Sequence, residues 1–322
     1  MSGLKKKIVV ALGGNALEDK SLPPTAQSQA MVVRRTAEYL AEMSCAGYEM
    51  AVVHGNGPQV GRIILASETA AQVTPPMPFD VCGAMSQGYI GYHLQQKLRS
   101  ALLARGRDIP VVTVVTQMVM DPEDPAFSNP TKPIGPFYTR EQAEKIAKET
   151  GYVLREDAGR GWRRVVASPK PRRIVEIGTL RTLWDSTIAI ACGGGGVPVM
   201  EGEHGELQGV AAVIDKDLAA QRLAGEMGAD MLLILTEVDA VSVDFRKPTE
   251  RKLGTVTAAE MEEYCRQGQF APGSMLPKVQ AALGFLRENP AGKAIITSLD
   301  RGLQGLQGTC GTTIVAEGGD SR

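Results

Sequence analysis

Residues 7–16 read Lys7-Ile8-Val9-Val10-Ala11-Leu12-Gly13-Gly14-Asn15-Ala16, an apolar run that ends in two glycines. The β-branched residues of this run predict a buried strand. Because Gly13 and Gly14 carry no Cβ, the main-chain N–H groups after the strand can approach an anion closely. A helix that starts there would add a positive N-terminus. The stretch therefore predicts a strand that delivers bare backbone to a phosphate group.

The same pattern follows two other predicted strands. Residues 49–54 lead into Gly55-Asn56-Gly57-Pro58, and residues 187–192 lead into Gly193-Gly194-Gly195-Gly196. In an open parallel sheet, ligands bind outside the carboxyl ends of the strands. We therefore expect the three glycine-rich loops to converge on one site.

Strand and helix patterns alternate along most of the chain. Apolar residues recur at helical spacing in 29–45, 83–104, 218–227, 258–266 and 276–287, and strand-like runs occupy 111–115, 188–192, 231–235, 294–297 and 312–316. This alternation predicts an α/β fold with a mostly parallel sheet that helices cover on both faces.

A proline-rich segment interrupts the alternation. Five prolines lie between positions 122 and 136, and a short helix is predicted over 141–150, ending at Gly151. The run of arginines between 155 and 173 is read as solvated surface, because acidic residues lie beside it. We expect a single domain over residues 1–322, with a lid-like subdomain protruding at about 122–171.

Composition excludes several classes of partner. The 322 residues carry 35 basic and 36 acidic side chains, a net charge of -1, which gives no electrostatic footprint for nucleic acid or an acidic membrane. The apolar run after the basic N-terminus is too short for a signal peptide or a membrane span. Five scattered cysteines without C-x-x-C spacing indicate neither a disulfide framework nor a zinc site. We expect a cytoplasmic protein that acts on small molecules.

Several catalytic motifs are absent from the sequence. There is no G-x-x-x-x-G-K-[ST], no H-E-x-x-H and no G-x-S-x-G. The tetraglycine does not match the dinucleotide fingerprint, because Pro198 or Val199 stands where the third glycine belongs. His54 ends a buried-looking strand and is interpreted as a satisfied core histidine rather than a base.

Three lysines have neighbours that restrict their backbone. Lys132 lies between Pro130 and Pro133, and Lys216 and Lys278 stand near predicted helix starts. Taken singly, each reads as an ordinary exposed lysine. A lysine in the first helical turn is unfavourable toward the helix dipole, so two of them indicate an anionic ligand. Asp217 can hold a lysine in register or cap its helix. Together, backbone amides and lysines suit phosphoryl transfer.

These segments resemble the carbamate kinases of the amino acid kinase family. The resemblance runs from Ala11-Leu12-Gly13-Gly14-Asn15-Ala16 through His54-Gly55-Asn56-Gly57-Pro58-Gln59-Val60-Gly61, Pro130-Thr131-Lys132-Pro133-Ile134-Gly135 and the tetraglycine, to Val213-Ile214-Asp215-Lys216-Asp217 and Gly273-Ser274-Met275-Leu276-Pro277-Lys278. It covers nearly the whole chain. The Pro-Thr-Lys-Pro-Ile-Gly and Ile-Asp-Lys-Asp elements are the most specific.

The resemblance implies a three-layer αβα sandwich around a mainly parallel eight-stranded sheet, and a homodimer. It implies the reaction ATP + carbamate ⇌ ADP + carbamoyl phosphate, used chiefly to make ATP in the breakdown of arginine or related nitrogen compounds. Mg²⁺ would be carried mainly by the phosphates of ATP or ADP, with no metal ligand from protein side chains.

The resemblance also implies a role for each site residue. The catalytic group would be Lys132, Lys216, Lys278 and Asp217. Substrate and phosphate would be bound by Gly13, Gly14, Asn15, Gly55, Asn56, Gly57, Gly194 and Gly195. The nucleotide would lie against Thr236, Glu237, Val238 and Lys278.

One departure and two alternatives accompany this prediction. Many relatives read Thr-Asp-Val-Asp where this chain has Thr236-Glu237-Val238-Asp239, with a bulkier residue near Ser242. One alternative is a kinase of the same fold that phosphorylates another small acid. The other is a binding protein without catalysis, and the presence of the three lysines and Asp217 argues against it.

Overall fold

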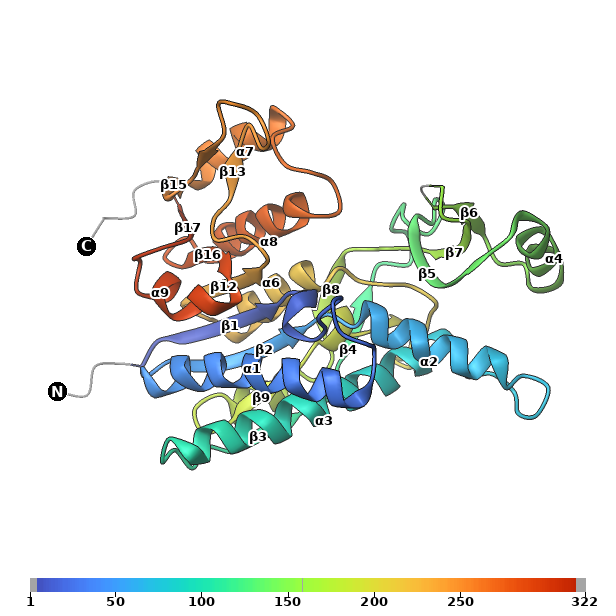
Figure 1. Ribbon diagram of the computed structural model, residues 1–322, viewed down its shortest axis with the longest axis horizontal. Coiled ribbons are helices and arrows are strands. Elements are labelled where there is room, and N and C mark those ends of the chain that lie inside the picture. Colours follow the sequence, from blue (N-terminus) through green and yellow to red (C-terminus); the bar gives the residue numbers. More distant parts are fainter. Residues whose placement is uncertain (1–4, 158, 317–322) are drawn as a thin grey trace.

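A central eight-stranded sheet organises the protein, in a computed structural model that describes residues 5–157 and 159–316 (Figure 1). Its strand order is β15 (Thr255–Thr257), β17 (Thr312–Val315), β16 (Lys293–Ser298), β12 (Met231–Thr236), β1 (Lys7–Leu12), β2 (Glu49–His54), β9 (Ile188–Ile190) and β3 (Val111–Thr113). Within this sheet β16 and β17 are antiparallel, and the other neighbours are parallel. The predicted mainly parallel sheet is confirmed.

Helices cover both faces of this sheet. One face carries α1 (Ala26–Cys45) and α3 (Phe79–Ala104), and the other carries α6 (Lys216–Met227) and α8 (Met275–Glu288). The remaining helices of the described residues are α2 (Gly57–Thr69), α4 (Arg140–Thr150), α5 (Ile177–Leu183), α7 (Ala258–Arg266) and α9 (Gly302–Leu306). The fold is therefore the expected αβα sandwich.

Strand β1 shows why both faces are apolar. Side chains alternate along a strand, so Val9 and Ala11 point to the α6 and α8 face, while Ile8 and Val10 point to the α1 and α3 face. All four side chains are fully buried.

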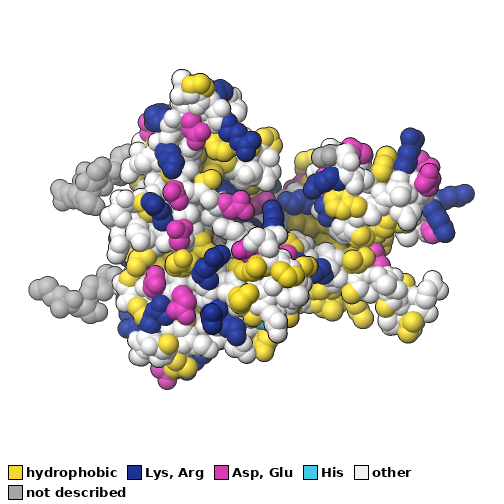
Figure 2. Space-filling view, viewed as in Figure 1, with side chains coloured by type: hydrophobic (Ala, Val, Ile, Leu, Met, Phe, Trp, Pro, Cys, Tyr) yellow, Lys and Arg dark blue, Asp and Glu magenta, His cyan; other side chains and the backbone are white. Residues whose placement is uncertain are grey.

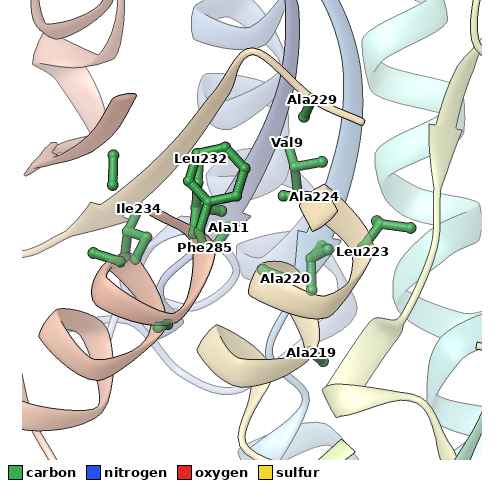
Figure 3. Close-up of a cluster of buried hydrophobic side chains, with 14 of the residues drawn as sticks. Val9, Ala11, Ala219, Ala220, Leu223, Ala224, Ala229, Leu232, Ile234 and Phe285 are labelled. Carbon is green, nitrogen blue, oxygen red and sulfur yellow. The ribbon is translucent and has the colours of Figure 1, made fainter. Parts of the chain in front are cut away.

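On the α6 face, Figure 3 shows Phe285 of α8 against the sheet beside a row of α6 alanines. The small alanines at 219, 220 and 224 let α6 approach the sheet closely, so that the loop before it is held against the strand ends.

Two smaller sheets extend the body. The first has the order β11 (Leu207–Gly209), β10 (Val197–Glu201), β4 (Gln117–Met120) and β8 (Pro171–Ile174). The second belongs to the insertion segment, residues 122–171, and has the order β5 (Lys132–Tyr138), β7 (Trp162–Val166) and β6 (Leu154–Glu156). A two-stranded ribbon joins β13 (Ser242–Val243) to β14 (Arg251–Lys252).

The insertion segment projects from the sheet-bearing body next to α2 (Figure 1). The Tyr138 hydroxyl donates to Glu68 Oε2 of α2 at 3.1 Å. Burial and the nearby Glu68 carboxylate raise the pKa of Tyr138 to about 12, so the phenol stays protonated as the donor. The helix predicted over 141–150 is present as α4, and Gly151 ends it in the left-handed conformation at φ 72°.

Some elements lie outside the predictions. Helix α2 begins at Gly57 and Pro58, residues that read as part of a loop, and β15 and the four-stranded sheet gave no clear periodic signal.

Basic and acidic side chains are interspersed over the face drawn in Figure 2. No helix among the described residues is long and apolar enough to cross a membrane.

Candidate active site

Three glycine-rich loops meet at the carboxyl end of the central sheet, as predicted. Strand β1 lies between β2 and β12, so Gly13 sits between the ends of both neighbours. A Cβ added at Gly13 would touch the Leu235 carbonyl oxygen at 2.9 Å, which shows how closely the chain passes β12. The Asn15 amide donates to the Thr236 carbonyl at 3.3 Å and fastens the first loop to β12.

Gly194 and Gly195 of the tetraglycine loop stand at positions where only glycine fits. Gly194 and Gly195 have φ values of 67° and 100°, a region that L side chains rarely adopt. A Cβ at Gly194 would overlap the Asn56 side chain, and one at Gly195 would overlap the Ile214 carbonyl oxygen. These glycines therefore let the loop close against the loop after β2 and the loop before α6.

A cavity of about 250 Å³ gathers most of the predicted site residues. Its walls are Gly55, Asn56, Gly57, Lys132, Gly194, Val213, Ile214, Asp215, Lys216, Asp217, Gly273, Ser274, Pro277 and Lys278. Four residues of the predicted substrate- and phosphate-binding set, Gly13, Gly14, Asn15 and Gly195, are outside this lining and belong to the neighbouring loops.

Asp217 holds two of the lysines at fixed positions in this cavity. Lys216 Nζ lies 2.6 Å from Asp217 Oδ1, and Lys278 Nζ lies 3.0 Å from Asp217 Oδ2. The Asp217 side chain is 3% exposed, whereas the lysines are about 15% exposed and reach the cavity. Burial alone would raise the pKa of Asp217, but the two ammonium charges and their hydrogen bonds outweigh it and hold the pKa below its usual value.

The third lysine, Lys132, belongs to the insertion segment rather than to the sheet-bearing body. Lys132 begins β5 of the insertion segment, and its Nζ lies 3.8 Å from Asp215 Oδ2. Asp215 is also the N-cap of α6, because its carboxylate accepts the Asp217 N–H at 2.9 Å. The capping role considered for Asp217 thus belongs to Asp215, and this leaves both oxygens of Asp217 for the lysines.

A larger cavity of about 630 Å³ adjoins the first, and Ser274 lines both. Of the four residues expected against the nucleotide, Glu237 and Val238 are in its wall, Thr236 is not, and Lys278 faces the smaller cavity. The wall also includes Asp239, Ser242 and Met275, which stand in or beside the motifs quoted from the sequence. It further includes residues that the sequence did not single out: Ala240, Asp244, Phe245, Lys247, Glu250, Lys252, Gly268, Gln269, Phe270 and Ala271. The aromatic side chain of Phe245 suits a flat ring, and the lysines of the adjoining smaller cavity suit phosphates attached to it.

The family model described as "Amino acid kinase family" matches residues 6–298. The chain belongs to the amino acid kinase family. A carbamate kinase of Clostridium perfringens is 53% identical over 96% of this chain and 99% of its own length. A carbamate kinase of Pyrococcus horikoshii is 49% identical over 97% of this chain and 99% of its own length. The solved structure of Giardia lamblia carbamate kinase bound to AMP-PNP superposes with a TM-score of 0.93 at 44% identity, covering 98% of this chain and 99% of that one.

His54 of this amino acid kinase is a structural histidine. It is 1% exposed and its Nδ1 lies 2.8 Å from the Gly55 carbonyl oxygen, so the ring stays fixed under the loop after β2. Burial lowers the pKa of His54 to about 4, and the imidazole is neutral at physiological pH. The interpretation of His54 as a satisfied core residue agrees with this geometry.

The described residues of this amino acid kinase contain no group of three histidine, cysteine, aspartate or glutamate side chains placed to hold a metal ion. At the candidate site the two carboxylates face lysines, Asp217 at 2.6 and 3.0 Å and Asp215 at 3.8 Å. This donor set fits a divalent cation that enters bound to nucleotide phosphates. The carboxylate oxygens of Asp215 and Asp217 already face lysines, so the cation would keep phosphate oxygens and water as its ligands.

Proposed function

We propose that this protein is a carbamate kinase, which transfers a phosphoryl group reversibly between ATP and carbamate to give ADP and carbamoyl phosphate. The observation that carries this proposal is the arrangement of Lys216 and Lys278 around one buried carboxylate, with Lys132 entering the same cavity. The names of the relatives with about half their residues identical support the choice of carbamate.

The chemistry needs charge neutralisation and positioning more than proton transfer. Carbamate already carries a negative oxygen and can attack phosphorus without a base. In the proposed site Lys132, Lys216 and Lys278 neutralise the phosphoryl oxygens as charge develops, and Asp217 keeps two of them in place. Mg²⁺ bound to the nucleotide phosphates would neutralise further charge.

The glycine-rich loops supply the remaining contacts in this proposal. Main-chain groups of Gly13, Gly14, Gly55 and Gly57 bind the carbamoyl and transferred phosphoryl groups, helped by Gly194. Asn15 and Gly195 shape these loops through the contacts described above. The nucleotide occupies the larger cavity, against Glu237 and Val238 and close to the end of β12 at Thr236.

We further propose that the enzyme works mainly toward ATP, from carbamoyl phosphate made in the breakdown of arginine or related nitrogen compounds, and that it does so in the cytoplasm. The five cysteines are free thiols in the structure, which suits a reducing compartment.

The insertion segment is proposed to act as a lid on a single domain. It carries Lys132 into the cavity and contacts the body through the Tyr138 to Glu68 hydrogen bond. Closure of such a segment would exclude water and protect carbamoyl phosphate from hydrolysis.

We also propose a homodimer through the face formed by α3 and the edge strand β3. This face holds a groove of about 690 Å³, and Tyr92, beside it, is 59% exposed. Sedimentation should show a dimer for the wild-type protein and a monomer for Tyr92→Glu. Val73→Glu, at a position 90% exposed in the loop after α2, is the control and should leave the dimer intact. A monomeric wild type contradicts the dimer.

The decisive experiment is ATP formation from ADP, Mg²⁺ and carbamoyl phosphate, followed with luciferase. We expect rapid synthesis by the wild type and a loss of about 10²-fold or more in kcat for Lys216→Ala, because a transition-state charge is removed. Lys145→Ala, a side chain 74% exposed on α4, is the matched control and should be unaffected. No ATP from folded wild-type protein would favour another acyl acceptor or a silent binder.

A further inference from the structure

The side chain of Asn56 stands at the start of helix α2 but does not cap that helix. It is the N-cap residue of α2, the place where asparagine usually accepts a hydrogen bond from the first helical turn, yet its side chain makes no such bond. Instead, Asn56 Nδ2 donates to Ser86 Oγ of α3 at 2.8 Å. The side chain is therefore diverted from its ordinary structural use toward the cavity that it lines.

The hydrogen bonds of Ser86 fix which way the Asn56 amide faces. The Ser86 hydroxyl has one proton, and it donates that proton to the Gly83 carbonyl oxygen at 2.6 Å, which can only accept. Ser86 Oγ must then accept from its other neighbour, and only the NH₂ end of Asn56 can donate. Ser86 is 0% exposed, so no solvent molecule substitutes for either partner. The amide oxygen of Asn56 consequently faces away from Ser86.

The tetraglycine loop also packs against the Asn56 amide. A Cβ at Gly194 would overlap the Asn56 amide, so this loop packs directly on it. Within the described residues Asn56 Oδ1 has no hydrogen-bond partner, whereas the carboxylates of Asp215 and Asp217 in the same cavity face lysines. Asn56 Oδ1 is thus a neutral, oriented acceptor beside a cluster of cations.

We propose that Asn56 Oδ1 accepts a hydrogen bond from the amino group of carbamate or carbamoyl phosphate, and that Ser86 is the positioning residue that keeps this acceptor turned toward the substrate. This assignment rests on the proposed carbamate kinase activity and specifies how it selects its substrate. The NH₂ group distinguishes carbamate from acetate, which carries a methyl group there. A neutral acceptor reads the NH₂ without repelling the anionic substrate. A site built around such a bond disfavours an analogue that leaves the acceptor unpaired.

The test compares two phosphoryl donors, carbamoyl phosphate and acetyl phosphate, in ATP formation with ADP and Mg²⁺. For Ser86→Ala we expect the ratio of kcat/KM values, carbamoyl over acetyl phosphate, to fall about tenfold, because the freed amide can turn its NH₂ end inward. Ser86→Thr keeps the hydroxyl and should restore the ratio. Thr182→Val removes a hydroxyl that bonds a carbonyl of its own helix, α5, away from the site, and it should leave the ratio unchanged.

A second variant keeps the test valid if Ser86→Ala does not fold. Asn56→Ala removes no helix cap and loses one side-chain hydrogen bond, to Ser86, so the melting temperature should fall by only a few degrees while the ratio again falls at least about tenfold. An active wild type whose ratio is unchanged in these variants overturns the selectivity role alone. A wild type inactive with carbamoyl phosphate overturns the proposed function and this assignment together.

Discussion

Replacing Asp217 by asparagine tests the proposed organisation of the lysines. The substitution keeps the shape of the side chain and removes the charge that faces Lys216 at 2.6 Å and Lys278 at 3.0 Å. An asparagine can accept from one ammonium through its oxygen, but its NH₂ group then points at the other. We expect the two lysines to separate and turn toward solvent.

The size of the effect follows from the burial of the pair. Breaking a buried ion pair by removing one partner costs about 3–5 kcal/mol, and the lysines can relax into the cavity, so about 3 kcal/mol is expected. A loss of that size corresponds to a drop in melting temperature of roughly 5–10 °C. The loss of kcat should reach about 10²–10³-fold, as for other removed transition-state contacts, with a smaller change in KM for ADP.

Acid should diminish the difference in stability between the wild type and Asp217→Asn. The pKa of Asp217 is lowered in the folded state, so its contribution is present above the usual value of 3.8 and is lost as the pH falls through the folded pKa. Urea denaturation from pH 7 to pH 3 should therefore show the two unfolding free energies converging below about pH 4.

The matched control for this prediction is Asp108→Asn. Asp108 also pairs with a basic side chain, Arg99, but it is 80% exposed, and such pairs contribute about 1 kcal/mol or less. If Asp217→Asn retains kcat within threefold of the wild type while folding normally, Asp217 does not organise the catalytic lysines.

Two other predictions concern the lid and the tetraglycine loop. In a Glu68→Cys, Tyr138→Cys double variant, a cleavable linker between the two thiols would join the insertion segment to α2, because the two side chains are in contact. Linking should stop turnover by fixing the insertion segment, and cleaving the linker should restore it. Linker-treated wild type is the control, and turnover in the linked protein would refute the lid. Gly195→Ala should lose activity and destabilise the fold far more than Gly205→Ala, since both have positive φ but only Gly195 faces a backbone atom, the Ile214 oxygen. Thermal melts showing equal losses would contradict this.

The sequence predicted the central sheet well because its signals are local. Buried strands such as β1 and β12 are runs of β-branched and aliphatic residues, and each ends at a recognisable turn. Helix α2 escaped prediction because its first turn contains Gly57 and Pro58, which are also the residues of loops. Proline nevertheless fits the first helical turn, where its missing N–H is not needed.

The sequence predicted which residues belong to the candidate site, but not which of them contact one another. The motif around Lys216 identified the lysine and both carboxylates, but not which carboxylate caps α6 and which holds the lysines. That division depends on Lys278, which lies 61 positions away in sequence. Ser86 gave no signal at all, because a serine in a long helix is common and its bond to Asn56 crosses between elements.

The two carboxylates give the three lysines different freedom. The smaller cavity is lined by three lysines and two aspartates, so one positive charge remains for an anionic ligand. Lys216 and Lys278 are held by a buried carboxylate and present their charge before any ligand binds. Lys132 is 42% exposed and its Nζ lies 3.8 Å from Asp215 Oδ2, so this ion pair is weak. A bound phosphoryl group can therefore replace Asp215 as the partner of Lys132 with little loss of free energy. Because Lys132 belongs to the insertion segment, binding of an anionic phosphoryl group in the cavity would draw this segment toward the site.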